Sequence, residues 1–303
     1  MSELRWNPLL GEWVATATHR QERTFMPPPD HCPLCPTEPG GFPTEAPEPA
    51  YDIVVFQNRF PSLQPIPPAP AAEGTELYPV EPARGLCEVV LYSPNHTSTL
   101  ANEPVTQIYK LIKVWTDRFR ELGQLDYVKY VFIFENKGAS VGVTLHHPHG
   151  QIYAYPFVPP RVAKELEQSR SFQEETGRCL LCDIIKEERR EGRRIVIENE
   201  SFAVYIPFFA RWPYEVHVSA KRHIQALTDF DESERRSLAI TLKQLLVAYD
   251  GLFDLSFPYM MVMHQRPSDG EDYSYYHFHI EFYPPLRTAT KSLSQNYQSI
   301  ELD

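Results

Sequence analysis

The sequence lacks the features that mark membrane-spanning, secreted and nucleic-acid-binding proteins. No apolar run approaches the roughly 20 residues of a membrane-spanning helix, and Met1 to Arg5 lead into no signal-peptide core. Acidic residues outnumber basic ones, 40 to 29, and the net charge of -11 argues against a nucleic-acid-binding surface. We therefore expect a cytoplasmic protein with no membrane or nucleic-acid partner, in which a nucleotide can still occupy a small local site.

Cysteine is scarce, and its spacing argues against a disulfide framework. Of five cysteines, four form two CxxC pairs, Cys32 with Cys35 and Cys179 with Cys182. In a reducing compartment, pairs with this spacing more often bind a metal ion than form a disulfide. The fifth, Cys87, lies in an apolar run and is expected to be a small buried side chain.

Residues 145–153, LHHPHGQIY, are the densest chemical feature of the chain, with three histidines in four positions. In an extended segment His147 and His149 share one face and His146 points away. One imidazole of such a pair can ligate a metal ion, and the other can act as a nucleophile or general base. The alternative is a histidine cluster on the surface. The lone histidines are expected on the surface or in turns: His19, His31, His146 and His217.

Hydrophobic periodicity predicts two helices and several strands. Apolar residues recur every three or four positions between Asn102 and Gly123, and a second such pattern runs from an acidic turn at 229–232 to Tyr249. Strands are predicted at residues 52–56, 127–135, 194–198, 214–218 and 259–263, and another ends at Tyr92. Proline-rich stretches at 27–49 and 61–82 predict irregular loops.

The two halves of the chain repeat one order of features. Each begins with a CxxC pair and passes through a strand, 52–56 or 194–198, to a segment that contains His96 or His223. A helix and a strand follow, and each half then reaches a His-x-His sequence. We interpret this order as a tandem duplication of one α+β unit, each copy an antiparallel-rich sheet with a helix packed on it. The predicted boundaries are residues 1–170 and 171–303.

The duplication groups the cysteines and histidines into two Cys2His2 sets. The first is Cys32, Cys35, His96 and His147, and the second is Cys179, Cys182, His223 and His277. Such sets suit tetrahedral zinc and leave no open coordination position, so both sites are predicted to be structural. For the second set, the alternative is a pair of buried thiols without a metal ion.

On these residues the chain resembles the histidine-triad superfamily and, within it, the galactose-1-phosphate uridylyltransferase family. The resemblance covers nearly the whole chain. It rests on Asn7-Pro8 with Gly11-Glu12-Trp13-Val14, Cys32-x-x-Cys35, Ser93-Pro94-Asn95-His96, Phe134-Glu135-Asn136-Lys137-Gly138, His147-Pro148-His149-Gly150-Gln151, Trp212-Pro213-Tyr214-Glu215 and Phe282-Tyr283-Pro284-Pro285-Leu286-Arg287. Together these motifs are highly specific, and each half is then expected to be a histidine-triad-like unit.

The resemblance implies a ping-pong nucleotidyl transfer. His149 would attack the α-phosphorus of UDP-glucose, release glucose 1-phosphate and carry UMP as a phosphoramidate until galactose 1-phosphate accepts it. A neutral imidazole suits this role because it is a good nucleophile and a fair leaving group. His147, held by zinc, would fix the neighbouring strand while a backbone carbonyl sets the tautomer of His149.

The resemblance also assigns substrate-binding residues. It places Phe56, Asn58 and Phe60 at the base and ribose, and Asn136, Gly142, Thr144 and Gln151 at the phosphates. It places Arg20 and Arg23 near the phosphates, across the interface of a homodimer. Superfamily hydrolases keep a histidine where this chain has Gln151. An amide can donate to a phosphoryl oxygen but cannot relay a proton, so transfer is favoured over hydrolysis.

Two departures from the family pattern matter. Some members have a further zinc or iron site made of one glutamate and three histidines. Glu165, His264 and His279 match it, but Glu281 stands where the third histidine would be. A carboxylate can replace an imidazole as a ligand, so a further metal site is one expectation and ordinary carboxylates with core histidines are the other. The segment after Arg287 also differs from the family's hexose-binding segment, which leaves the sugar specificity open.

Two other functions would use many of the same residues. One is an adenylyltransferase or phosphorylase of the same superfamily that acts on ADP-glucose, because the base-contact residues do not separate uracil from adenine. The other is a non-catalytic, zinc-stabilised nucleotide-binding protein. Such a protein would keep the zinc ligands but would not need His149 and Gln151, so an enzyme is favoured.

Overall fold

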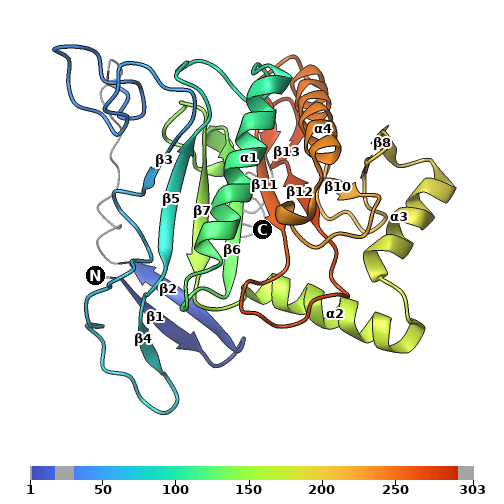
Figure 1. Ribbon diagram of the computed structural model, residues 1–303, viewed down its shortest axis with the longest axis horizontal. Helices are drawn as coiled ribbons and strands as arrows, with labels where there is room; N and C mark the ends of the chain where they lie inside the picture. Colours follow the sequence, from blue (N-terminus) through green and yellow to red (C-terminus); the bar gives the residue numbers. More distant parts are fainter. Residues whose placement is uncertain (1, 18–30, 293–303) are drawn as a thin grey trace, which may run out of the picture.

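One nine-stranded sheet organises the residues that the computed structural model describes, 2–17 and 31–292 (Figure 1). Its strand order is β3-β5-β7-β6-β11-β12-β10-β9-β8, and every neighbouring pair is antiparallel. The strands are β3 (Val54–Gln57), β5 (Leu86–Leu91), β6 (Tyr130–Lys137), β7 (His149–Tyr155), β8 (Ile195–Glu198), β9 (Phe202–Tyr205), β10 (Val216–Ala220), β11 (Tyr259–His264) and β12 (His279–Tyr283). The predicted α+β class is confirmed.

The sheet contains one four-strand arrangement twice. The orders β3-β5-β7-β6 and β9-β10-β12-β11 run inward to the central β6–β11 pair, in which Phe134 lies opposite Val262. By position in the sheet, the counterpart of β3 is therefore β9. The predicted equivalence of strands 52–56 and 194–198 was wrong, because β8 is an extra edge strand. The two repeats share one continuous sheet through this central pair.

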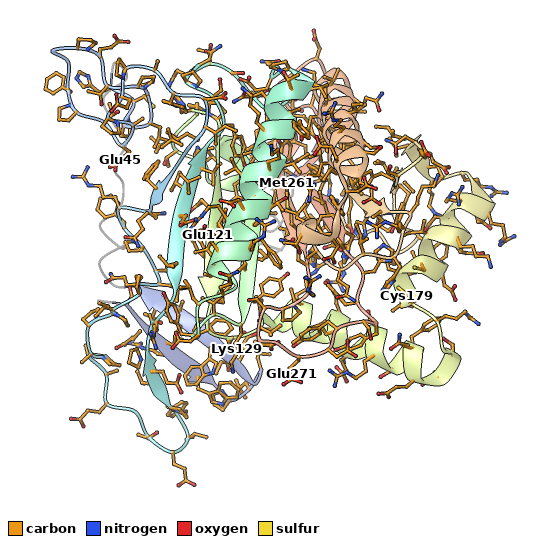
Figure 2. The ribbon with its side chains drawn as sticks, viewed as in Figure 1. Glu45, Glu121, Lys129, Cys179, Met261 and Glu271 are labelled. Carbon is orange, nitrogen blue, oxygen red and sulfur yellow. The ribbon has the colours of Figure 1, made fainter. Side chains whose placement is uncertain are left out.

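Two helices cover one face of the sheet and close the core. Helix α1 (Val105–Leu122) and helix α4 (Glu232–Gly251) pack against each other over the central strands, as Figure 1 shows. Trp115 and Leu242 from these helices join Val131 and Met261 from the sheet in one buried cluster; Figure 2 shows Met261 behind the helix layer. Both helices lie where periodicity predicts them, because residues three and four apart share one helix face.

Helices α2 (Pro160–Thr176) and α3 (Leu180–Glu191) connect the two halves, and the sequence analysis did not predict them. Among its residues, α2 buries only Val162 and Leu166, so its apolar periodicity is weak. Other signals were present in the sequence. A proline stands at the first helical position, and Gly177 ends the helix in the left-handed conformation, with φ of 71°.

A smaller sheet lies beside the N-terminal half, with strand order β2-β1-β4. It consists of β1 (Ser2–Asn7), β2 (Glu12–Ala17) and β4 (Val80–Pro82), and a short hairpin of β13 (Leu286–Thr288) and β14 (Lys291–Ser292) follows β12. The described parts of the proline-rich stretches are largely irregular, as predicted. Within residues 2–17 and 31–292, no helix is long and apolar enough to cross a membrane.

Candidate active site

His149 opens strand β7, which lies between β5 and β6. The register places Gln151 of the same strand opposite both Val89 and Phe134. Nδ1 of His149 lies 2.7 Å from the backbone carbonyl oxygen of His147. A carbonyl oxygen only accepts, so Nδ1 carries the proton and the lone pair lies on Nε2. Burial lowers the pKa of His149, which favours the neutral imidazole that a nucleophile needs.

A cavity of about 380 Å³ lies beside His149. The predicted nucleotide-site residues within the described part of the chain line it together: Phe56, Asn58, Phe60, Asn136, Gly142, Thr144, His149 and Gln151. Arg20 and Arg23 lie outside the described residues. The sequence analysis missed Pro33 and Leu34, which also line the cavity. Because they stand between Cys32 and Cys35, the CxxC loop forms part of the cavity wall.

The side chain of Gln151 is oriented by two donors. Its Oε1 accepts from Nδ2 of Asn58 at 3.4 Å and from the hydroxyl of Tyr153 at 3.3 Å. The carbonyl end of the amide is thus engaged by the protein. The amide N–H groups are left to donate to an acceptor in the cavity.

Gly150 is required by the close approach of Tyr92 behind His149. A Cβ atom at this position would lie 1.9 Å from the Tyr92 hydroxyl oxygen and 3.1 Å from the carbonyl oxygen of Phe134. The backbone N–H of Tyr92 also donates to the carbonyl oxygen of Pro148 at 3.1 Å. Tyr92 therefore holds the residues on both sides of His149.

The first predicted Cys2His2 set comes together beside the cavity. Cys32, Cys35, His96 and His147 each place a ligand atom within 4.8 Å of the others. Nδ1 of His96 and Nδ1 of His147 lie 3.5 and 3.7 Å from Sγ of Cys35. Nε2 of His147 instead faces the carbonyl oxygen of Ser93 at 2.9 Å, which directs the Nδ1 lone pair toward the sulfurs. Burial lowers the pKa of His147 to about 4, and a neutral ring is what metal ligation requires.

The second set repeats this geometry. Cys179, Cys182, His223 and His277 also place their ligand atoms within 4.8 Å of one another. Nδ1 of His277 lies 3.3 Å from Sγ of Cys182 and 3.6 Å from Sγ of Cys179, while its Nε2 faces the carbonyl oxygen of Ala220 at 2.9 Å. The donor atoms of both sets fit a tetrahedral metal ion.

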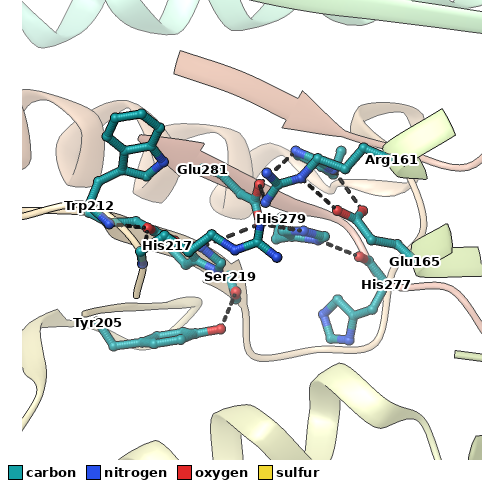
Figure 3. Close-up of polar contacts among 12 residues, drawn as sticks. Arg161, Glu165, Tyr205, Trp212, His217, Ser219, His277, His279 and Glu281 are labelled. Atoms are coloured by element: carbon teal, nitrogen blue, oxygen red, sulfur yellow. Dashed lines mark hydrogen bonds and ion pairs between the residues drawn. The ribbon is translucent and has the colours of Figure 1, made fainter. Parts of the chain in front are cut away.

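The third set, Glu165, His264, His279 and Glu281, is brought together as well, with ligand atoms within 4.8 Å. Nδ1 of His264 lies 2.8 Å from Glu165 and its Nε2 lies 3.0 Å from Glu281. Burial alone would lower the pKa of His264, but the two carboxylates raise it to about 10. Arg161 from α2 joins the cluster, with Nη2 2.8 Å from Oε2 of Glu281 (Figure 3). This cluster is thus rich in charges of both signs.

Two family descriptions match consecutive parts of the sequence. "Galactose-1-phosphate uridyl transferase, N-terminal domain" matches residues 1–159, and the corresponding C-terminal domain matches residues 165–293. The chain belongs to the galactose-1-phosphate uridylyltransferase family. The family resemblance inferred from the motifs is confirmed.

Relatives in this family are similar along most of their length. The galactose-1-phosphate uridylyltransferase of Thermotoga maritima is 45% identical over 96% of this chain and 89% of its own. That of Haemophilus influenzae is 37% identical over 94% and 85% of the two chains. A solved uridylyltransferase structure has a TM-score of 0.85 at 36% identity and covers 96% of this chain and 88% of that one. An Arabidopsis thaliana ADP-glucose phosphorylase with bound ADP-glucose has a TM-score of 0.70 at 25% identity, with coverage of 95% and 90%.

His217 is a residue whose position the sequence analysis predicted wrongly. It was expected on the surface or in a turn, but it lies in β10 and is 3% exposed. Nε2 of His217 lies 3.2 Å from Glu215 and 3.3 Å from Glu281. Every residue of β10 is buried, so the strand has no alternation of apolar and polar residues that would show which face His217 occupies. In this member of the family, His217 therefore extends the third cluster.

Glu135 is a second buried group to which the sequence analysis gave no role. It lies in β6 beside Asn136, is 5% exposed, and its Oε1 accepts from the hydroxyl of Tyr259 at 3.1 Å. Burial raises the pKa of Glu135 to about 7. Alternation along β6 places Glu135 on the same face as Val131 and Ile133, and this was a sequence signal for its burial.

Proposed function

We propose that this chain transfers UMP from UDP-glucose to galactose 1-phosphate through a uridylyl-His149 intermediate. One observation carries the proposal. The carbonyl oxygen of His147 holds the proton of His149 on Nδ1, which leaves the Nε2 lone pair on a ring that lines the nucleotide-sized cavity. A free imidazole would be present as both tautomers, whereas this ring is already in the nucleophilic one.

The first half-reaction is a displacement at phosphorus. The Nε2 lone pair of His149 forms a bond to the α-phosphorus, and the bond from that phosphorus to the bridging oxygen breaks. Glucose 1-phosphate leaves with the electron pair. In the second half-reaction, a phosphate oxygen of galactose 1-phosphate attacks the same phosphorus and the P–N bond breaks, which yields UDP-galactose and restores the neutral ring.

Gln151 supports transfer rather than hydrolysis. Asn58 and Tyr153 engage its carbonyl oxygen, so its amide N–H groups are available to a phosphoryl oxygen as charge builds up there. An amide is too weakly basic to take a proton from water at neutral pH, so it cannot act as a general base for hydrolysis. The acceptor phosphate is already anionic and needs no such base.

We propose that zinc occupies both Cys2His2 sets as a structural ion. Two thiolates and two neutral imidazoles satisfy its tetrahedral preference and leave no position for substrate. Elemental analysis of the purified protein should find two zinc ions per chain. Replacing Cys32 or Cys179 with Ser should each remove one of them.

Further assignments rest on the sequence alone: the location on its composition, the two halves on its repeat, and the dimer and the arginines on the family resemblance. We propose a cytoplasmic homodimer, histidine-triad-like halves bounded at residues 1–170 and 171–303, and a role for Arg20 and Arg23 near the substrate phosphates across the dimer interface. Sedimentation analysis of the full chain tests the dimer. Replacing Arg20 or Arg23 with Met should raise the KM for UDP-glucose if these side chains contact phosphate.

The deciding experiment is the intact mass of the protein after incubation with UDP-glucose or ADP-glucose, kept alkaline because phosphohistidine is acid-labile. We expect an added uridylyl mass that disappears when galactose 1-phosphate is added. The His149→Gly variant is the control and should gain no mass. An adenylyl mass would instead support an ADP-glucose enzyme of the same superfamily, and the absence of any adduct on folded, zinc-loaded protein would contradict covalent transfer.

A further inference from the structure

The third cluster occupies, in the second half, the place that the nucleophile occupies in the first. His279 opens β12 as His149 opens β7, and its Nδ1 lies 3.0 Å from the carbonyl oxygen of His277. Glu281, two residues on, takes the place of Gln151. The second repeat has thus kept the orientation of the ring but has replaced the neutral amide with a carboxylate.

Both carboxylates of the cluster are supplied with hydrogen-bond or ion-pair partners by the protein. Oε2 of Glu165 lies 2.8 Å from Nδ1 of His264 and accepts from the Tyr276 hydroxyl at 2.9 Å. Oε2 of Glu281 lies 3.0 Å from Nε2 of His264 and 2.8 Å from Nη2 of Arg161. Oε1 of Glu281 lies 3.3 Å from Nε2 of His217. Figure 3 shows Arg161 reaching Glu165 and Glu281 from one side, and His217 on the opposite side of Glu281.

The two imidazoles are not arranged as ligands of one ion. The rings of His264 and His279 are nearly parallel, with an interplanar angle of 17° and centroids 4.6 Å apart. The histidine pairs of the two Cys2His2 sets stand edge to face instead, at 61° and 76°. Ligand lone pairs lie in the ring plane, so nearly parallel stacked rings direct them along similar lines, whereas edge-to-face rings allow them to converge.

His264 contacts both carboxylates through its ring. Glu165 lies at Nδ1 and Glu281 at Nε2. The contact at Nε2 is an ion pair that departs from hydrogen-bond geometry, so Nε2 is the nitrogen of this ring from which a metal could be bound. Nε2 of His279 is the second such nitrogen in the cluster, 3.6 Å from Oε1 of Glu281. A metal ion bound between them would have to displace the guanidinium of Arg161 from Glu281.

We infer that this cluster is a metal-free charge network, in which Arg161 and the ring of His264 take the place of a bound cation. The change from histidine to Glu281 provides a carboxylate for Arg161. The network joins α2, which leads out of the N-terminal half, to β11 and β12 of the second half. This chain therefore keeps the residues that match a metal site and uses them as an electrostatic link between its two repeats.

The test is a metal count on the full-length protein, which does not depend on turnover. Wild type and the His264→Ala variant are incubated anaerobically with excess Fe2+ or with excess Zn2+, desalted, and analysed for metal per chain. We expect two zinc ions and no iron in wild type, and the same count in the variant. A third metal ion in wild type that His264→Ala loses would overturn the inference.

An experiment that creates a metal site tests the roles assigned to Arg161 and Glu281. The double variant Arg161→Met with Glu281→His removes the internal cation and the carboxylate that faces Nε2 of His264, and it supplies the third imidazole. The ring of His264 is then free to turn out of the stacked arrangement, so the variant should bind one more divalent ion than wild type. Its matched control, Arg161→Met with Glu281→Gln, loses the same charges without gaining an imidazole and should stay at two. Retention of two zinc ions shows that each variant is folded. A folded Glu281→His double variant that still binds only two ions would contradict the exclusion of metal by Arg161 and Glu281.

Discussion

The backbone carbonyl of His147 accepts the Nδ1 proton of His149, while the ring of His147 belongs to the first Cys2His2 cluster. His147 therefore contributes to both sites. Its side chain belongs to the cluster, and its main chain sets the tautomer of His149. A metal ion in this cluster would act on the chemistry by fixing the segment that orients His149, without touching substrate.

Replacing His149 with Gly should lower turnover by more than about a thousandfold, because no other group can carry the UMP. The variant should keep two zinc ions and stay folded, with a free energy of unfolding lower by about 1 kcal/mol because glycine weakens a strand. Steady-state kinetics, metal analysis and urea unfolding measure these three quantities. Wild-type turnover in the variant would refute the assignment of the nucleophile.

The two Cys2His2 clusters should differ in their effect on substrate binding. Pro33 and Leu34 line the nucleotide cavity from within the first CxxC loop, so Cys32→Ser should raise the KM for UDP-glucose about tenfold or more. The matched variant Cys179→Ser should lower the melting temperature but leave that KM unchanged. Equal changes in KM for the two variants would show that the first loop has no special role in nucleotide binding.

Glu135 should make stability depend on pH. Its pKa is about 7 when folded, raised by burial from 4.5, so the folded state holds its proton more tightly than the unfolded state does. This contribution to stability is fully present below pH 4.5 and is lost as the pH rises through 7. Glu135→Gln should therefore gain about 2 kcal/mol relative to wild type between pH 5 and pH 8, measured by urea unfolding.

An exposed carboxyl is the control for this pH effect. Glu73→Gln changes a side chain on the surface and is measured under the same conditions. If the difference between Glu135→Gln and wild type were no larger than that of Glu73→Gln at every pH, the carboxyl of Glu135 would not be protonated in the folded protein at pH 5 to 7.

Gly150→Ala should destabilise the protein by about 1–3 kcal/mol, the usual cost of overpacking, and should reduce turnover. The added methyl group would overlap the hydroxyl of Tyr92 and displace the residue next to His149. Adding Tyr92→Phe removes the overlapping oxygen and should recover part of the loss. Urea unfolding and kcat of the single and double variants test this prediction. If Gly150→Ala were as stable as wild type, β7 would be able to shift away from Tyr92 without cost.

Arg161→Met should lower the free energy of unfolding by about 1–2 kcal/mol, a value reduced because the arginine side chain is 51% exposed. The loss arises because Glu281, only 4% exposed, keeps its charge but loses a donor. Lys164→Met, which breaks the exposed pair with Glu167 on the same helix, is the control and should leave stability unchanged. Equal effects of the two variants would mean that Arg161 forms an ordinary surface ion pair.

Local spacing explains why much of this protein was predictable. Helix α1 follows from apolar residues three and four apart, and the CxxC and His-x-His spacings place ligands within one loop or strand. The repeat of these spacings in both halves allowed ligands far apart in the chain to be grouped. Pro33 and Leu34 were missed as cavity residues because their role depends on how the loop between two ligands lies against the sheet.

The sequence by itself determined the α+β class and the two Cys2His2 sets, because residue identity, short spacing and their repetition carry that information. The family, the third cluster and the predicted nucleotide-site residues followed from the resemblance of its motifs. The tertiary structure alone decided that the two repeats share one sheet and that α2 lies where Arg161 meets Glu281, 120 positions away. It also decided that His217 is buried. These features depend on long-range packing, in which the partners of a side chain are set by strand order and not by its neighbours in the chain.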